Sequence, residues 1–452
     1  MFKFLNLHQD YFTNSKNIAN NMHYFAPQIT KFTKGTVASQ IIVPKHNFLE
    51  ITQYFNRLNQ DQDHFYNSND ICTPMQCVKE MVDSLPESFW QKADLKILDP
   101  CCGNGNFFAY IATKTNLENL YFNEINPKRI INLKKYFGDN INFSNCDFLE
   151  FDQKNMFDLV VANPPYAKFS ENNVRVSKNH NLSRDFIKKA LEITKIGGYI
   201  LFISPNNWMS FSDRNLLPQL LSQYQFITID IHGAKKWFPK VGSSFTWFLL
   251  QKIENSFPCK INNNYVLKDA VFANINKNSK FIPLYYSEIV RNIVNKTINN
   301  NLLPKYKVLT SSYLHHYTKK HLFNNVETAE FKYKIIHTPT QTVWSKKPHK
   351  YQDFHKVLLS LTNQYQVFTE YGSGITQSIA FIICKNLTES QDIAKELSNP
   401  VYKFLNNITR YGNFNNIRVL QNLPIFSSFE LTNSENDFIL EFNNKYYGEK
   451  EK

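Results

Sequence analysis

Apolar residues between about positions 70 and 252 form short runs that alternate with segments of helical spacing. The runs at 95–100, 119–125, 158–165, 198–205, 227–233 and 243–252 have the length of buried strands. Residues 73–85 and 183–194 instead place apolar side chains on one helical face. Strands that alternate with helices predict an α/β fold with a doubly wound, mainly parallel, Rossmann-like sheet. The two runs at 227–233 and 243–252 are expected to pair as antiparallel strands at one edge of this sheet.

The pattern changes after about residue 256, where polar and asparagine-rich segments predominate. One helix is expected at 388–408, interrupted at Pro400. We therefore divide the chain into three parts. Residues 1–60 form an arm or subdomain of unknown role, 61–255 the α/β domain, and 256–452 a mixed α+β domain that ends in a short charged tail.

Composition limits the class of protein. The chain has 452 residues, of which 42% are hydrophobic, so it can bury a sizeable core. It has no run of about 18 apolar residues and no signal peptide at its start, so we expect a cytoplasmic protein without a membrane span. The seven cysteines are scattered and form no CxxC pair, which predicts reduced thiols, no disulfides and no metal site.

The net charge of +13 is concentrated in the second half. Residues 256–452 hold 24 Lys and Arg against 15 Asp and Glu, whereas residues 1–255 hold 27 against 23. The basic residues stand among aromatics, as in "WSKKPHKY" at 344–351. This mixture suits a nucleic acid, which offers phosphates and stackable bases. A solvated basic face would give the same composition.

A glycine turn follows the first predicted strand in "ILDPCCGNGNFF", residues 97–108. The strand ends at Asp99, and the glycines at Gly103 and Gly105 allow a ligand to approach the backbone closely. A carboxylate at the strand end suits a cationic or hydroxyl-bearing ligand better than a pyrophosphate.

Further polar residues follow the next three strands. Glu124 comes after the second strand, Asp147 and Phe148 after the third, and Asn163 begins "NPPY" after the fourth. Open α/β sheets bind ligands at the carboxyl ends of their strands, where an acid after the second strand holds a ribose diol. Each acid alone would be an ordinary loop carboxylate, but their succession predicts a nucleotide-like ligand.

These motifs and their order resemble those of the γ-class N6-adenine DNA methyltransferases, the TaqI-type family that uses S-adenosylmethionine. The resemblance covers about 70–252 well and 256–428 loosely. It rests on "CTPMQCVKEMV", "ILDPCCGNGNF", "VVANPPY", "RDFIKKALEI" and "GAKKWFPKVGSSFTWFLLQK". It implies that residues 61–255 are the catalytic domain and 256–452 the DNA target-recognition domain.

The resemblance also implies roles for individual residues. S-adenosylmethionine is the expected cofactor, and the expected cofactor-binding residues are Thr73, Asp99, Cys101, Gly103, Gly105, Glu124, Asp147, Phe148 and Phe186. The expected catalytic residues are Asn163, Pro164, Pro165 and Tyr166. Tyr166 and Phe238 are expected to stack on the target base, with Phe245 as the competing second ring.

The chemistry of "NPPY" follows from the nucleophile. The N6 nitrogen of adenine is a poor nucleophile because its lone pair is conjugated into the ring. The side-chain oxygen of Asn163 and the carbonyl of Pro164 can accept both amine hydrogens and free that lone pair, and the prolines hold these acceptors rigid. Tyr166 offers a ring face for a base flipped out of the duplex.

The sequence therefore predicts a site-specific DNA adenine-N6 methyltransferase, the modification enzyme of a restriction-modification system. Double-stranded DNA and a cognate restriction endonuclease for the same site are the expected partners, and we expect a monomer. Two alternatives use the same chemistry: a protein-glutamine N5 and an RNA adenine N6 methyltransferase. The basic, aromatic region that follows the catalytic motif favours DNA.

Overall fold

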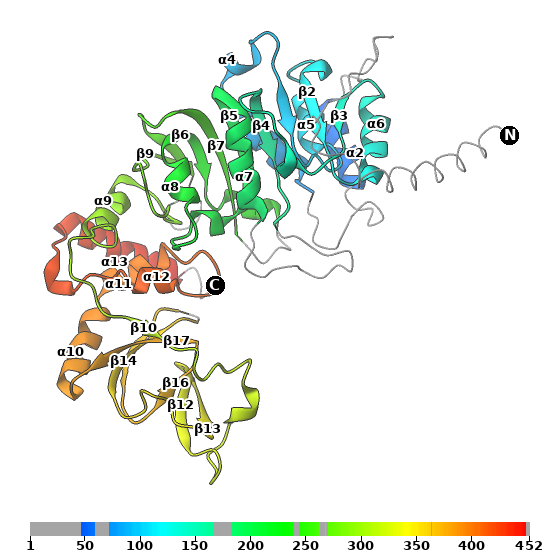
Figure 1. Ribbon diagram of the computed structural model, residues 1–452. Coiled ribbons are helices and arrows are strands. Elements are labelled where there is room, and N and C mark those ends of the chain that lie inside the picture. The colour runs from blue at the N-terminus through cyan, green and yellow to red at the C-terminus, as the bar shows by residue number, and fades with distance from the viewer. Residues whose placement is uncertain are drawn as a thin grey trace.

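The computed structural model describes residues 47–58, 72–166, 182–238, 244–262, 267, 270–362 and 364–448. Figure 1 shows a large sheet with helices in the upper part of the view and two smaller sheets in the lower part. Helices α11 (Pro400–Asn407), α12 (Ile417–Leu420) and α13 (Asn433–Gly448) lie between them. No helix in these described ranges is long and apolar enough to cross a membrane.

The large sheet has nine strands in the order β3-β2-β1-β4-β5-β7-β6-β8-β9. The first five strands in this order pair in parallel, and β7 runs antiparallel between β5 and β6. The predicted doubly wound, mainly parallel sheet is therefore confirmed. The strands are β1 Ile97–Asp99, β2 Leu120–Asn123, β3 Asn142–Ser144, β4 Phe157–Ala162, β5 Thr194–Pro205, β6 Tyr224–Asp230, β7 Phe245–Glu254, β8 Cys259–Asn262 and β9 Ala270–Ala273.

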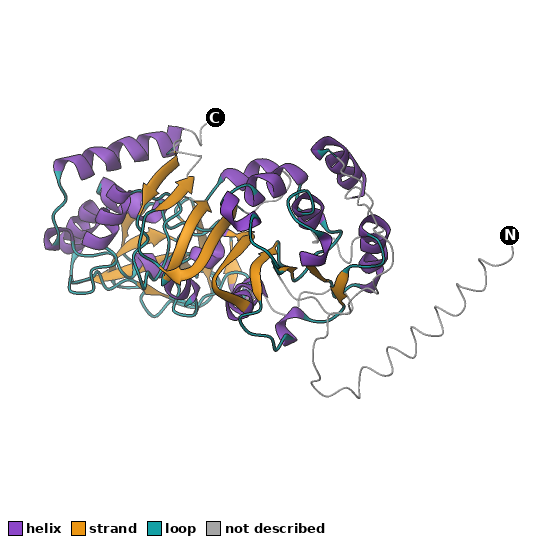
Figure 2. Ribbon diagram, turned by 90° about the horizontal axis from the view of Figure 1, so that it is seen from above, coloured by secondary structure: helices purple, strands orange, loops and turns teal. Residues whose placement is uncertain are grey.

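Helices cover both faces of this sheet (Figure 2). Alternate residues of β4 show why, since Leu159 and Val161 enter one apolar cluster while Val160 and Ala162 enter the other. The helices of this region are α2 Phe48–Leu58, α3 Met75–Val82, α4 Glu87–Trp90, α5 Asn106–Ile111, α6 Pro127–Phe137, α7 Leu182–Ile193 and α8 Leu217–Leu221. The short 3-10 helices are η2 Leu117–Asn119, η3 Phe148–Glu150, η4 Asn206–Met209 and η5 Gly233–Trp237.

Helix α2 packs against the helices of the large sheet, although we expected residues 1–60 to form a separate arm or subdomain of unknown role. Its residues Ile51 and Phe55 are buried. Phe48 packs edge-on against Tyr110 of α5, with ring centroids 5.4 Å apart. Phe55 meets Tyr136 of α6 at 5.1 Å. Residues 1–46 lie outside the described residues.

Two boundaries differ from the prediction. The sheet continues past residue 255 through β8 and β9, so the strands at 227–254 are not its edge. The segment expected as a charged tail forms α13, because Ile439, Phe442 and Tyr446 provide it with an apolar stripe. The ring of Phe442 packs on Tyr285 with centroids 5.0 Å apart.

The remaining C-terminal region is mixed α+β, as predicted. One four-stranded sheet has the order β10-β17-β14-β15 and the other β11-β13-β12-β16. Their strands are β10 Leu309–Thr310, β11 Phe323–Asn324, β12 Tyr333–Thr338, β13 Gln341–Ser345, β14 His355–Ser360, β15 Val367–Glu370, β16 Gly374–Ile375 and β17 Ile379–Cys384. The other helices are α9 Glu288–Lys296, α10 Leu387–Leu397, η6 Lys320–Leu322 and η7 Phe426–Ser428. The helix predicted at 388–408 is α10 followed by α11, which starts at Pro400 as expected.

The C-terminal region shares one apolar core with the large sheet. Val357 of β14 and Phe404 of α11 belong to the same cluster of buried side chains as Phe248 of β7. Phe404 also meets Phe442 of α13 with ring centroids 5.0 Å apart. The two parts of Figure 1 are therefore joined by continuous packing.

Candidate active site

The glycine loop after β1 requires both of its glycines. Gly103 and Gly105 have φ angles of +57° and +89°, in the left-handed region that other residues rarely adopt. A Cβ atom on Gly105 would lie 2.6 Å from the ring of Phe137 and 2.8 Å from Leu133. Gly105 therefore lets α5 begin directly against α6, which brings the loop onto the carboxyl end of the sheet.

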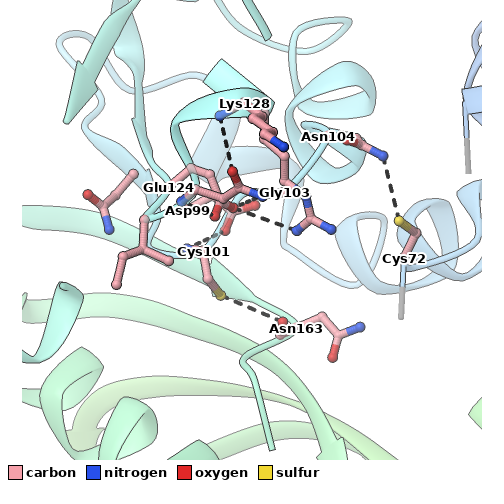
Figure 3. A network of polar contacts seen from close by, with 12 residues as sticks. Cys72, Asp99, Cys101, Gly103, Asn104, Glu124, Lys128 and Asn163 are labelled. Atoms are coloured by element: carbon pink, nitrogen blue, oxygen red, sulfur yellow. Dashed lines mark hydrogen bonds and ion pairs between the residues drawn. The ribbon is translucent and has the colours of Figure 1, made fainter. Parts of the chain in front are cut away.

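Glu124 fixes this loop from the end of β2. Its Oε2 accepts a 2.8 Å hydrogen bond from the amide of Gly103, and its Oε1 accepts a 2.9 Å bond from the amide of Asn126 (Figure 3). The guanidinium of Arg129 lies 3.9 Å from Oε2. Because the side chain is only 5% exposed, the carboxylate is held in one position.

Asp99 lies at the same strand edge and is also buried. Its Oδ1 accepts a hydrogen bond of 3.2 Å from the amide of Cys101. Burial raises the pKa of this carboxyl well above its usual value, and the nearby charge of Glu124 raises the pKa further. A cation bound beside Asp99 would therefore favour its ionised form.

Asn123 joins three strand ends and was not predicted as a site residue. Its Nδ2 donates to the carbonyl oxygens of Pro100 at 2.9 Å and Cys146 at 3.1 Å. Its Oδ1 accepts a 2.6 Å bond from the hydroxyl of Ser144. An asparagine directly before Glu124 at a strand end was the only sequence signal for this role, and such asparagines are common in this chain.

The residues expected beside a cofactor base also come together. Asp147 accepts a 3.0 Å bond from the amide of Leu149 and so caps η3. The ring of Phe148 contacts Phe186 of α7, with centroids 5.1 Å apart and planes at 47°. Phe148 and Phe186 are almost fully buried, whereas Asp147 is half-buried.

Asn163 lies just after β4 and contacts both the glycine loop and Thr73, which precedes α3. Its Nδ2 donates a 3.1 Å bond to the hydroxyl of Thr73. The Sγ of Cys101 donates to the backbone oxygen of Asn163 at 3.6 Å (Figure 3). Asn106 of α5 in turn donates to the carbonyl of Thr73 at 2.7 Å. Thr73 and Cys101 thus both contact the first residue of the NPPY segment.

Tyr166 ends the NPPY segment and begins a row of aromatic rings. Its hydroxyl donates a 2.5 Å bond to Oδ1 of Asn163. Its ring is next to Phe245 at 5.7 Å, and Phe245 stacks on Phe238 at 4.9 Å with planes at 30°. The structure thus places Phe245 between Tyr166 and Phe238, the two rings that we expected to stack on the target base.

The residues of this row differ in exposure. Tyr166 is half-buried, while Phe238 and Phe245 are buried. Pro164 is buried and Pro165 exposed.

No group of three or more His, Cys, Asp or Glu side chains among the described residues could hold a metal ion. The site consists instead of two buried carboxylates, an oriented amide and a row of rings. These groups suit an organic cation with hydroxyl groups on one side and a planar amine on the other.

Part of the chain matches a known protein family. Residues 86–238 match the sequence model of the family described as Eco57I restriction-modification methylase. The match spans α4 to η5 and so includes both the glycine loop and the NPPY segment. Over these residues it confirms the resemblance that the motifs predicted.

A curated relative matches a shorter segment. The Type II methyltransferase M.AccI of Acinetobacter calcoaceticus is 28% identical in an alignment 129 residues long, which covers 25% of this chain and 24% of that protein. The chain thus spans about a quarter of the length of this relative.

Two solved structures align with parts of the chain. The ATP-dependent Type ISP restriction-modification enzyme LlaBIII, solved bound to DNA, matches 88% of this chain and 41% of its own, with 12% identity and a TM-score of 0.52. A Type I restriction-modification methyltransferase subunit from Streptococcus thermophilus matches 46% of this chain and 49% of its own, with 16% identity and a TM-score of 0.36. The match to LlaBIII extends the shared fold beyond the large sheet into the C-terminal region.

Proposed function

We propose that this chain is the modification enzyme of a restriction-modification system and methylates the N6 amine of an adenine within a specific site of double-stranded DNA. The observation that carries the proposal is the orientation of the Asn163 amide. Thr73 binds its nitrogen at 3.1 Å, so its oxygen faces Tyr166 at the carboxyl end of β4. A planar amine bound against Tyr166 would meet this oxygen.

S-adenosylmethionine fits the residues at the end of the sheet and would supply an activated methyl group. Glu124 would hold the ribose hydroxyls, because it directly follows β2, and an acid at the end of the second strand holds the ribose diol in nucleotide-binding sheets. Asp99 would face the cationic part of the ligand. Asp147 and Phe148 would hold the base, with Phe186 packed behind Phe148. The left-handed Gly103 leaves the loop without a side chain at its closest approach.

The chain's own contribution to catalysis is to hold acceptors around the amine. Asn163 Oδ1 and the Pro164 carbonyl would each accept one amine hydrogen and so make the nitrogen lone pair available. Pro164 and Pro165 fix the backbone, so the acceptors need not reorganise during the reaction. Preorganised groups of this kind typically contribute about 10²–10³ in rate.

The aromatic row would receive the flipped base. Tyr166 supplies one face, and the contact of Phe245 with Tyr166 favours Phe245, with Phe238 behind it, as the opposite wall. Stacking contributes about 1–3 kcal/mol per base, comparable with the few kcal/mol that flipping costs.

We assign DNA recognition to the C-terminal region that begins after β9. Lys346, Lys347 and Lys350 are exposed just after β13, and Lys350 lies 4.6 Å over the ring of Tyr351. The amide of Lys346 donates to the carbonyl of Leu322 at 3.1 Å, which brings this turn beside the lysine-containing η6. Lysines on an ordered turn suit contacts with phosphates. A cognate endonuclease and a monomeric state stay predictions.

The test is transfer of labelled methyl groups to three substrates: mixed-sequence duplex DNA, RNA and a release-factor protein. We expect label only in DNA, as N6-methyladenine within one recurring sequence mapped by methylation-sensitive sequencing. The Asn163→Ala variant is the negative control and measures label that is incorporated without the proposed acceptor. Label in RNA or in a protein glutamine would replace the proposed function with one of the two alternatives.

A further inference from the structure

A carboxylate on α3, outside the predicted site, contacts the segment that leads to Phe238. Oε2 of Glu80, on α3, accepts a 3.2 Å bond from the indole Nε1 of Trp237. The same oxygen lies 2.8 Å from Nζ of Lys236. The Lys236 amine also lies 4.8 Å over the Trp237 ring, so the three side chains form one compact group.

Glu80 and Asp230 hold the two ends of η5. At the N-terminal end of η5, Oδ1 of Asp230 accepts a 3.2 Å bond from the amide of Ala234. At its C-terminal end, Glu80 binds Lys236 and Trp237. The next residue is Phe238, whose amide donates to the carbonyl of Lys235 at 3.1 Å. Rotation of η5 would therefore move Phe238 directly.

Phe238 connects the end of η5 to the NPPY segment through ring contacts. Its ring stacks on Phe245, and Phe245 contacts Tyr166. Tyr166 is hydrogen-bonded to Asn163. A line of contacts thus runs from the Glu80 carboxylate through η5 and three rings to the proposed acceptor.

The segment that contains α3 contacts both ends of this line. Thr73, two residues before the helix, accepts the amide hydrogen of Asn163, and Glu80 lies in the last turn of the helix. The same short segment therefore contacts both the proposed acceptor and the end of η5. A shift of α3 against η5 would change the space between the wall and the acceptor.

We propose that Glu80 is a positioning residue for the target base: by holding Lys236 and Trp237 it fixes η5, and so places the Phe238–Phe245 wall opposite Tyr166. The inference deepens the proposed function and rests on it. An ordinary half-exposed ion pair would affect folding stability slightly and the reaction not at all. A positioning pair would affect the reaction far more than stability, since misplacement of about 1 Å in a reacting geometry can cost about 10²-fold.

The experiment uses the full chain, a duplex that contains the mapped site, and three variants. Glu80→Ala removes both contacts, and Glu80→Gln keeps an acceptor for Trp237 without the charge for Lys236. Asp83→Asn is the matched control, because Asp83 is the C-cap residue of the same helix and pairs with Lys79 and Lys114 and not with η5. The readouts are kcat, KM for DNA, cofactor affinity, melting temperature, and the emission of 2-aminopurine at the target position.

We expect Glu80→Ala to lower kcat/KM for DNA about ten- to a hundredfold. The emission of the flipped 2-aminopurine should rise, because a displaced ring quenches it less. Glu80→Gln should be intermediate, and Asp83→Asn should match wild type. Cofactor affinity should stay within about twofold, and the melting temperature within about 4 °C.

Two results would overturn the inference alone: wild-type kinetics and emission in Glu80→Ala, or an equal loss in Asp83→Asn, which would indicate a general effect on α3. A wild-type chain that transfers no methyl group to adenine in DNA would overturn the proposed function and, with it, the role of Glu80.

Discussion

The hydroxyl of Tyr166 donates a hydrogen bond to the side-chain oxygen of Asn163, the atom that we propose as an acceptor for the target amine. An amide oxygen has two lone pairs, so the tyrosine bond and an amine bond can coexist. Thr73 binds the nitrogen of the same amide. The two contacts together hold the amide in the orientation that the reaction needs before any base arrives.

The first prediction separates the ring of Tyr166 from its hydroxyl. Tyr166→Phe keeps the ring and removes one hydrogen bond, worth about 0.5–1.5 kcal/mol, so single-turnover methyl transfer should slow about tenfold or less. Tyr166→Ala also loses stacking worth about 1–3 kcal/mol and should be clearly slower. Equal rates for the two variants would show that the ring has no role.

The second prediction concerns Asn163. Asn163→Ala should lower kcat about 10²–10³-fold because it removes a preorganised acceptor. Cofactor affinity, measured by calorimetry, should not change. Thr73→Val keeps the acceptor but removes the hydrogen bond to the amide nitrogen of Asn163, so its loss of rate should be smaller. Activity of Asn163→Ala within about tenfold of wild type would contradict the acceptor role.

The third prediction tests the ribose position. Glu124→Ala should weaken S-adenosylmethionine binding by at least about 1.5–3 kcal/mol, the range for hydrogen bonds to a charged group. Asp147→Ala is the parallel test for the cofactor base. Glu118→Ala, at an exposed acid just before β2, is the control and should bind normally. Calorimetry that finds unchanged affinity in Glu124→Ala would remove this residue from the cofactor site.

The fourth prediction follows from the raised pKa of Asp99. The buried carboxyl holds its proton to a higher pH than usual, and a cationic ligand favours the ionised form. Cofactor affinity should therefore rise as pH increases through the raised pKa, with release of a proton on binding. Calorimetry in two buffers of different ionisation enthalpy measures that proton. Asp99→Asn should abolish the proton release, and release that persists in this variant would point to another group.

The fifth prediction concerns the lysines after β13. Replacing Lys347 or Lys350 with Gln should weaken binding to all DNA sequences about equally and reduce the salt slope by about 0.9 per phosphate contact. Lys445→Gln on α13, where the lysine pairs with Glu441, is the control. A change in sequence preference instead would mean that these lysines contact bases.

Much of the catalytic part could be predicted because its signals are local. Apolar runs that alternate with segments of helical spacing predicted the strands. Polar residues at successive strand ends indicated one edge of a parallel sheet. The structure brings Asp99, Glu124 and Asn163 to that edge. Pro400 likewise separated α10 from α11, because proline begins a helix more readily than it continues one.

The parts that could not be predicted depend on contacts between distant segments. Residues Glu80 and Trp237 are 157 positions apart, and no pattern near either one indicates the other. The short strands β8 and β9 join the sheet only because β6 offers an open edge for β8. Helix α13 looked like a charged tail because its polar residues outnumber the few apolar ones that reach Tyr285.

The common core of the large sheet and the C-terminal region has a consequence for the DNA. Phe248 of β7, Phe404 of α11 and Val357 of β14 belong to one packed cluster, so the catalytic and C-terminal parts cannot swing on a hinge without exposing it. This packing therefore holds the two parts at a fixed distance from each other. If the C-terminal part reads the site, then the interval between the bases that are read and the base that is modified is set inside the protein, by side chains that never touch the duplex.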